Sequence, residues 1–230
     1  MSALPLFYFP GLQNATGIVD LDEEIKRHAV TVLRMNVGEL LLLTDGKGYT
    51  CEARIAIATK KQLAVDLLER TAHPAPPKKM VLGISLLKNT ARFEWMLEKV
   101  TEIGVTEIYP LLCERTERQH FRKDRFAQII TSACLQSQQF HFPILQEPKR
   151  LEELFRLDLP TQRFIAHCMD GEKKQLGSVA NDAVLLVGPE GDFTPSELEL
   201  SIANGFQPVS LGASRLRTET AGIVGVVMMR

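Results

Sequence analysis

The sequence lacks the features of a membrane protein, of a secreted protein and of a metal-binding protein. No apolar run approaches the roughly 18 residues that a membrane-spanning helix needs, and MSALPLFYFP at the N-terminus has neither the basic leader nor the apolar core of an export signal. The four cysteines are far apart, without the paired spacing of a zinc site or a disulfide framework. The five histidines show no metal-ligand spacing. We therefore expect a cytoplasmic protein without a bound metal.

An excess of positive charge is also missing. The chain carries 27 basic and 28 acidic residues, so no global field attracts nucleic acid, and any contact with RNA must be local. Hydrophobic residues make up 45% and charged residues 24% of the chain. This is ordinary usage for a soluble globular protein, and the length fits one large domain or two small ones.

The first seventy residues predict a small barrel-like unit. Short strands are expected at 6–10, 39–45, 49–59 and 63–69, around one helix at 21–34. Asp45-Gly46 followed by Gly48 is a hairpin signal, because glycine takes the positive φ that such turns demand. Three prolines in HPAPPKK, residues 73–79, block both helix and strand. We place a domain boundary there, which gives domains of 1–72 and 73–230.

Beyond the boundary, apolar strands alternate with helices. Strands are predicted at 80–87, 107–113, 163–169, 183–187 and 208–212, and helices at 89–103, 124–138, 195–205 and 218–230. This alternation indicates an α/β fold with a mostly parallel sheet. The last helix, GIVGVVMM, is apolar nearly all the way round. We expect it to be buried by the core or by another subunit.

One strand-to-helix turn, LLVGPEGDFTPSELE at 185–199, is a candidate ligand site. Loops at the carboxyl ends of parallel strands bind ligands in open α/β sheets, and Thr194 to Glu197 form a capping box with proline at the first helical position. The turn lacks the glycine spacing of a dinucleotide site and the lysine of a P-loop. Glu190 and Asp192 would repel an anion, so a neutral or positively charged ligand suits it better.

A second glycine-bearing loop follows the strand at 208–212. Leu211-Gly212 could admit the edge of an adenine to the backbone, and Arg215 and Arg217 could meet polyanions. Glu219 or Thr220 could hydrogen-bond a sugar or a base. Two neighbouring strand ends would then present loops of complementary kinds.

These two loops carry a family resemblance. LLVGPEGDFT and SLGASRLRTETA resemble the paired signature of the RsmE family, the ribosomal RNA uridine-N3 methyltransferases of the SPOUT superfamily. LLKNTARFEWMLEKVTEIGV and RHAVTVLRMNVGE resemble two further segments of that family, so nearly the whole chain is covered. One departure lies in CLQSQQ, where Leu135 and Gln139 replace the family's usual glutamate and arginine.

The resemblance implies a fold, a cofactor and partners. The fold is an α/β, SPOUT-type domain whose chain forms a trefoil knot, preceded by a PUA-like β-barrel for RNA. The cofactor is S-adenosylmethionine (S-adenosyl-L-methionine), the substrate is 16S ribosomal RNA of the small subunit, and the enzyme works as a homodimer. The expected cofactor-binding residues are Val187, Gly188, Pro189, Glu190, Gly191, Leu211, Gly212, Leu216, Arg217, Thr218, Thr220 and Ala221.

Methylation at N3 of uridine requires that the N3 proton leave, so a base or an anion stabiliser is needed. Glu190 and Glu219 are the candidate bases, and Arg217 could stabilise charge on the uracil oxygens. Lys26 and several other basic residues are candidates for RNA contact. The principal ones are Arg27, His28, Arg34, Lys88, Arg92, Arg115, Arg118 and Arg215.

Two alternatives stay open on sequence alone. The altered CLQSQQ segment allows a non-catalytic RNA-binding protein that keeps a degenerate cofactor pocket. A metabolic α/β enzyme that binds a nucleotide phosphate would predict a lysine or a further glycine within residues 188–194, and neither is there.

Overall fold

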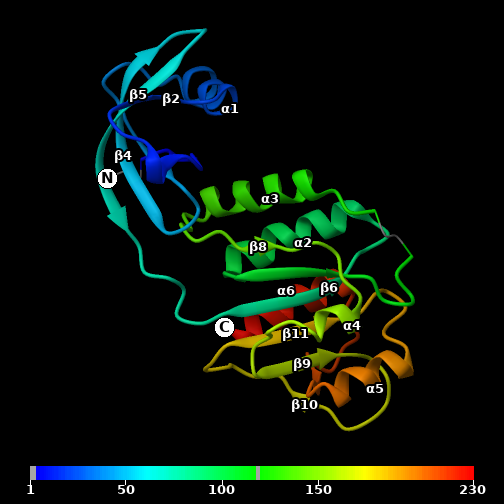
Figure 1. The fold of residues 1–230 in the computed structure, drawn as a ribbon. Coiled ribbons are helices and arrows are strands. Elements are labelled where there is room, and N and C mark those ends of the chain that lie inside the picture. Colours follow the sequence, from blue (N-terminus) through cyan, green and yellow to red (C-terminus); the bar gives the residue numbers. More distant parts are fainter. Residues whose placement is uncertain (1–3, 118–119) are drawn as a thin grey trace. The chain divides into compact units, whose positions relative to one another are not determined.

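A computed structural model describes residues 4–117 and 120–230 of the chain (Figure 1). The chain divides into two compact units. The first unit comprises Met1–Ala75 with Cys134–Phe142, and the second comprises Pro76–Ala133 with Pro143–Arg230. No helix in the described part of the chain is both long and apolar enough to cross a membrane.

A five-stranded sheet in the order β1-β3-β4-β5-β2 forms the first unit. β1 pairs with β3 in parallel, and the other neighbours are antiparallel. The unit's core is aliphatic, with Leu41, Leu43, Ile55 and Val65 almost fully buried. The strands are β1 (Leu6–Tyr8), β2 (Ile18–Asp20), β3 (Leu40–Thr44), β4 (Tyr49–Ala58) and β5 (Leu63–Ala72), with a 3₁₀ turn at Leu12–Asn14.

The helix predicted at 21–34 is two different helices joined end to end. α1 (Glu23–Lys26) is a single α-helical turn, and it continues into a six-residue π-helix, Arg27–Val32. The wider turn is visible in the bond from Leu33 N to His28 O, five residues back, at 2.9 Å. Arg34 follows with φ of +56°, which ends the helix.

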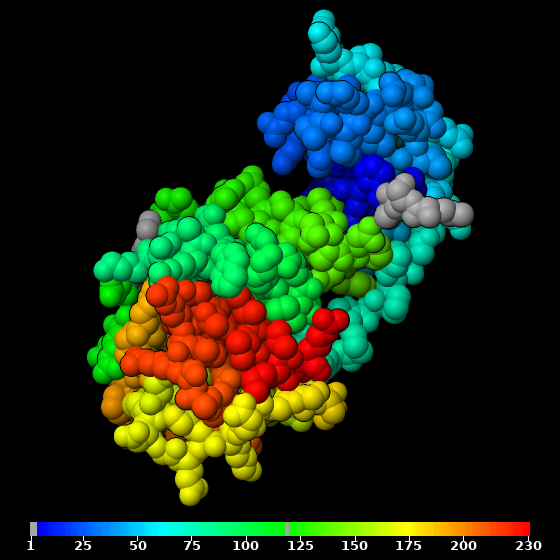
Figure 2. All heavy atoms as spheres, turned by 180° about the vertical axis from the view of Figure 1, so that it is seen from behind, coloured from blue at the N-terminus to red at the C-terminus, as the bar shows by residue number. Residues whose placement is uncertain are grey.

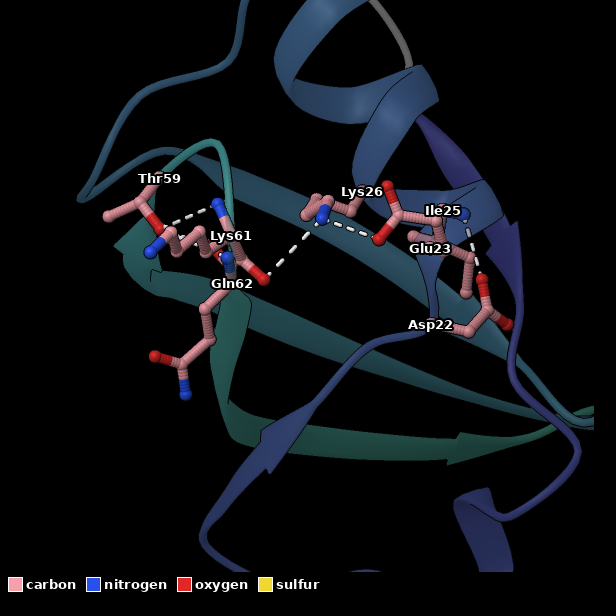
Figure 3. Close-up of polar contacts among 7 residues, drawn as sticks. All are labelled: Asp22, Glu23, Ile25, Lys26, Thr59, Lys61 and Gln62. Atoms are coloured by element: carbon pink, nitrogen blue, oxygen red, sulfur yellow. Dashed lines mark hydrogen bonds and ion pairs between the residues drawn. The ribbon is translucent and has the colours of Figure 1, made fainter.

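Lys26 is a structural residue of this unit, although its charge suggested a contact with RNA. Its side chain is buried between the carboxylate of Glu23 and the carbonyl of Lys61, which its ammonium reaches at 3.4 Å (Figure 3). Asp22 caps the helix by accepting the Ile25 N–H at 2.8 Å. The ammonium therefore joins α1 to the β4–β5 turn and does not point into solvent.

The predicted hairpin at Asp45–Gly48 joins β3 to β4 and is confirmed, with φ of +69° at Gly46 and +98° at Gly48. The two glycines also leave space for aromatic rings that pack against the hairpin. A Cβ on Gly46 would lie 2.8 Å from the Phe142 ring, and one on Gly48 would lie 2.3 Å from the His141 ring. Residues 134–142 thus pack on this hairpin, and they belong to the first unit although they follow residues 76–133 of the second unit in the sequence.

The second unit contains a seven-stranded sheet in the order β10-β12-β9-β11-β6-β7-β8, with every neighbouring pair parallel (Figure 1). This confirms the predicted parallel α/β layer. β6 and β11 are buried along their whole length, as their continuous apolar sequences require. The strands are β6 (Met80–Ser85), β7 (Glu107–Leu111), β8 (Ile144–Leu145), β9 (Gln162–Ala166), β10 (Lys174–Gln175), β11 (Ala183–Val187) and β12 (Gln207–Ser210).

Side-chain caps mark the start of two helices of this unit, α2 and α5. Asn89 caps α2 by accepting the N–H groups of Ala91 and Arg92, and Gly104 ends it in the left-handed conformation. Thr194 and Glu197 form the predicted capping box of α5. The helices are α2 (Thr90–Ile103), α3 (Lys123–Gln136), α4 (Leu151–Leu154), α5 (Pro195–Ala203) and α6 (Thr218–Met229).

α6 packs on β6, β11 and α2, and two glycines, Gly222 and Gly225, lie at this contact. A Cβ on Gly222 would lie 2.7 Å from Ile84 Cδ1, and one on Gly225 would lie 2.1 Å from Leu185 Cδ2. The two glycines therefore let the helix backbone approach the sheet closely. This packing fixes where α6 begins, and the first turn of α6 carries the candidate residues Thr218 and Glu219.

Candidate active site

The three adjacent strands β12, β9 and β11 end at one cavity of about 760 Å³ in the second unit. Its wall consists of the three loops that leave these strands, at 167–173, 188–192 and 211–217, together with the start of α6 and Arg92 of α2. The carboxyl ends of parallel strands are the usual ligand site of open α/β sheets. The geometry thus joins the two loops singled out in the sequence and adds a third.

The turn after β11 is tight and braced from outside the cavity. Asp192 N donates to Pro189 O at 2.9 Å, and a Cβ on Gly188 would lie only 3.0 Å from the Phe193 ring. Arg115 donates to the carbonyl of Gly191 at 2.8 Å. The guanidinium of Arg115 therefore holds the turn in shape.

Asp192 ties this turn to the loop after β9. It adopts φ of +64°, a strained value for a residue with a side chain. Its carboxylate accepts the N–H of Cys168 at 2.8 Å and the N–H of Phe193 at 2.9 Å. Strain of this kind persists where surrounding bonds fix the backbone, and it is common at functional sites.

The loop after β12 leads directly into α6. Gly212 has φ of +140°, and Ser210 Oγ donates to its carbonyl at 3.0 Å. Arg217 is the N-cap residue of α6 and is exposed, whereas Glu219 in the first turn is buried. Glu219 Oε1 lies 3.7 Å from Arg92 Nε, so an ion pair from α2 holds the carboxylate at the cavity wall.

The structure brings together most of the residues predicted to bind a cofactor. Gly191 and Thr220 do not line the cavity, and all three candidate catalytic residues, Glu190, Arg217 and Glu219, do. The predicted cofactor residues at the wall are Val187, Gly188, Pro189, Glu190, Leu211, Gly212, Leu216, Arg217, Thr218 and Ala221.

The residues predicted to bind RNA are dispersed. Arg27, His28 and Arg34 are exposed in the first unit, and Arg215 and Arg92 line the cavity. Lys88 pairs with Glu117 at 2.6 Å beside a smaller, open hollow that also includes Arg92 and Glu190. Arg115 braces the turn after β11, and Arg118 lies outside the described residues.

The loop after β9 was not predicted from the sequence as part of the site. The predicted strand at 163–169 ends at Ala166, three residues early, so His167 and Cys168 stand in the loop and line the cavity together with Lys173. The end of β9 was the signal that could have revealed this loop. An apolar run that reads through His167 to Met169 concealed it.

Among the described residues that line the cavity, His167 is the one with buried side-chain polar atoms that have no partner. Both ring nitrogens are buried without a hydrogen-bond partner among the described residues. Burial, with a smaller contribution from Lys173, lowers the pKa of His167, so the ring is neutral at pH 7. A neutral ring with two unpaired nitrogens at a cavity wall points to a polar ligand.

Comparison with known proteins agrees with this geometry. The family model described as "RNA methyltransferase domain" matches residues 74–230, and that described as "RNA methyltransferase PUA domain" matches residues 21–68. The ribosomal RNA small subunit methyltransferase E of Mycobacterium bovis is 30% identical over 98% of this chain and 92% of its own length. The chain belongs to the ribosomal RNA small subunit methyltransferase E family.

Solved structures of similar chains have the same fold. A chain from Porphyromonas gingivalis superposes with a TM-score of 0.90 at 37% identity, with 97% of this chain and 95% of that chain covered. The methyltransferase E of Neisseria gonorrhoeae, solved bound to S-adenosyl methionine, gives 0.86 at 31% identity, with the same coverage. These matches confirm the fold class predicted for this chain, which is a SPOUT-type α/β domain preceded by a PUA-like domain.

Proposed function

We propose that the protein transfers a methyl group from S-adenosylmethionine to N3 of a uridine in 16S ribosomal RNA. The observation that carries this proposal is the single cavity at which the GPEG turn and the RLRTET loop meet. The names of the relatives and the cofactor in the Neisseria structure support it. Residues 73–230 are the catalytic domain in this proposal, and residues 1–72 are the RNA-binding domain.

The residues at the cavity fit such a cofactor. The cofactor carries a sulfonium cation, and Glu190, Asp192 and Glu219 supply negative charge at the wall. Lys173 and Arg215 on the same wall suit its carboxylate. The glycine-bearing bends at 188–191 and 211–212 offer backbone groups to its adenine. When bound, the cofactor supplies an electrophilic methyl group.

The chain's own residues have to remove a proton and stabilise charge. The N3 proton of uridine leaves to a carboxylate in reach, and buried Glu219, held by Arg92, is the better placed of the two candidates. Glu190 is exposed at the rim. Arg217, the N-cap residue of α6, stabilises negative charge on the uracil oxygens.

RNA docks through local basic residues, because the chain as a whole has no positive excess. Arg27 and His28 lie in the π-helix of the first unit, Arg34 follows it, and all three are exposed. Lys88, Arg92 and Arg215 lie at or beside the cavity. Phosphate contacts position the strand, and the target base must be unpaired or flipped for N3 to be reached.

Affinity for a ribosomal RNA fragment is expected to fall as salt rises. Each lost phosphate contact lowers the slope of log K against log salt by about 0.7–0.9. The double variant Arg27→Gln, Arg34→Gln should therefore reduce the slope by roughly 1.5 in a fluorescence-anisotropy titration. Arg156→Gln, at an exposed arginine of the second unit that does not line the cavity, is the matched control. An unchanged slope in the double variant would remove the first unit from the RNA site.

The protein acts as a homodimer through α6. Figure 2 shows this helix, in red, at the surface of the second unit. Val227 is 53% exposed, and Ile223, Val224 and Met228 are half-buried. No charged residue lies between Glu219 and Arg230, so this face of α6 has no solvating charge, and a second copy of the same helix would cover it.

Val227→Glu is expected to convert the dimer to a monomer, because a carboxylate would be buried without a partner in the interface. Sedimentation analysis of wild type and variant measures this. Glu199→Gln, an exposed position on α5, serves as the control for changed surface charge. A wild type that sediments as a monomer at micromolar concentration would refute the dimer.

The decisive test of function is mass spectrometry of nucleosides from small-subunit RNA, in cells with and without this protein. We propose that 3-methyluridine disappears in its absence, and that the protein acts in the cytoplasm, where ribosomes are assembled. An unchanged level would overturn the substrate. Calorimetry with S-adenosylmethionine separates the enzyme from the alternative, an RNA-binding protein with a degenerate pocket, because only the enzyme should bind it.

A further inference from the structure

His167 stands immediately after β9 and lines the cavity, and both nitrogens of its ring are buried and unpaired among the described residues. Folding removes these nitrogens from water and supplies no partner in the protein. Buried polar groups in folded proteins nearly always have a partner. The ring is therefore arranged for something that enters the cavity.

The backbone around the ring is fixed independently of any ligand. Lys173 donates to the carbonyl of His167 at 3.1 Å and to that of Met169 at 2.7 Å. The next N–H along the chain, from Cys168, donates to Asp192 at 2.8 Å. These three bonds hold the backbone directly after the histidine, and β9 holds it directly before, so its position is built into the site.

The charge state of the ring limits what it can bind. Burial lowers the pKa of His167, Lys173 lowers it further, and Asp192 opposes them. The neutral imidazole has one N–H donor and one lone pair. It suits an uncharged group that can donate or accept, whereas a carboxylate or an ammonium would be matched by the charged residues of the same wall.

The position of β9 separates this histidine from β6, one of the strands on which the helix of Glu219 packs. β11 lies between β9 and β6, and adjacent strands are about 4.8 Å apart, which places β9 about 10 Å from β6. The pair Arg92–Glu219 belongs to α2 and α6, and α6 packs on β6 and β11. His167 thus follows a strand that β11 separates from β6, and its neutral ring suits a role in binding.

Two uncharged parts of the cofactor offer both donors and acceptors, namely the adenine edge and the ribose hydroxyls. An adenine edge presents them side by side, but the two imidazole nitrogens point in diverging directions and cannot both meet one flat edge. A hydroxyl donates and accepts at a single atom, so it satisfies whichever nitrogen it meets.

We propose that His167 recognises a ribose hydroxyl of the cofactor and thereby selects a ribonucleoside over its deoxy forms. This inference rests on the proposed function, since it takes S-adenosylmethionine as the ligand. The residue is a binding and specificity residue, and it takes no part in proton removal.

Calorimetry with S-adenosylhomocysteine and its 2′-deoxy and 3′-deoxy forms tests the proposal, with wild type and His167→Phe compared. The wild type should bind at least one deoxy form about tenfold more weakly than the parent compound. His167→Phe should bind the parent about tenfold more weakly and should not discriminate against that deoxy form. His120→Phe, at an exposed histidine that does not line the cavity, should behave as wild type.

Each contrary outcome has a distinct meaning. A wild type that binds all three compounds equally, or a His167→Phe variant that still discriminates, overturns the inference and leaves the function intact. A wild type that binds none of them overturns the proposed function and the inference with it. His167→Asn, which keeps a polar side chain, should melt within a few degrees of His167→Phe, so that loss of folding is recognised.

Discussion

Glu219→Gln should lower the single-turnover rate of RNA methylation by about 10²-fold or more, with the cofactor still bound. General-base assistance contributes 10²–10⁴-fold in enzymes, and glutamine keeps the shape of the side chain but cannot take the proton. Glu219 is buried at the cavity wall, and its contact with Arg92 at 3.7 Å fixes it in place. A rapid-quench assay with cofactor in excess measures the chemical step.

Glu190→Gln is the companion variant, and a smaller effect is expected because Glu190 is exposed. Glu199→Gln on α5 is the control, since it removes a carboxylate that does not line the cavity. If both cavity variants methylate at the wild-type rate with cofactor bound, neither carboxylate is the base. Calorimetry on the same samples separates a slow chemical step from lost cofactor binding.

Gly225→Ala should destabilise the second unit by about 1–3 kcal/mol, which is the usual cost of overpacking a core. The added methyl would lie 2.1 Å from Leu185 Cδ2, and that side chain is fully buried in β11, so it can shift only against the packed core around it. Alanine ordinarily stabilises a helix by about 1 kcal/mol relative to glycine, so the expected effect has the opposite sign to helix propensity. Thermal melting should show a fall of about 2–4 °C for each kcal/mol.

Leu185→Ala provides the matched test of this explanation. Alone it should cost about 2–5 kcal/mol through the cavity that it leaves. Combined with Gly225→Ala it should cost at least about 1 kcal/mol less than the sum, because the new methyl group occupies the vacated space. Gly177→Ala, at a glycine with open space around it, should leave the melting temperature nearly unchanged. Strict additivity in the double variant would show that close packing at Gly225 is not the cause.

The sequence predicted the parts of the fold and site that depend on short patterns. The capping box at Thr194, the hairpin glycines and the buried strand 183–187 are each fixed by neighbouring residues, and the structure has all three. The loops after β11 and β12 were found in the same way, because glycines and hydroxyls at strand ends are local signals.

Features that depend on distant parts of the chain could not be predicted. Nothing around Arg115 in the sequence indicates that its partner is the carbonyl of Gly191, 76 residues away. His167 was read as part of a strand, because apolar residues continue past the point where pairing with β11 stops. One local feature also differs from the prediction: residues Arg27–Val32 form a π-helix, and side-chain periodicity does not distinguish it from an ordinary helix.

The first unit borrows Cys134–Phe142 from beyond its own stretch of chain. Phe140 stacks on His73 at 4.1 Å, and Phe142 packs against Tyr8 at 5.1 Å. A fragment that stops at residue 75 would expose these aromatic surfaces and the bare glycines beneath them. Any graft of the first unit onto another enzyme must therefore carry the nine-residue return segment, so the two halves of the chain cannot be exchanged between proteins by a single crossover.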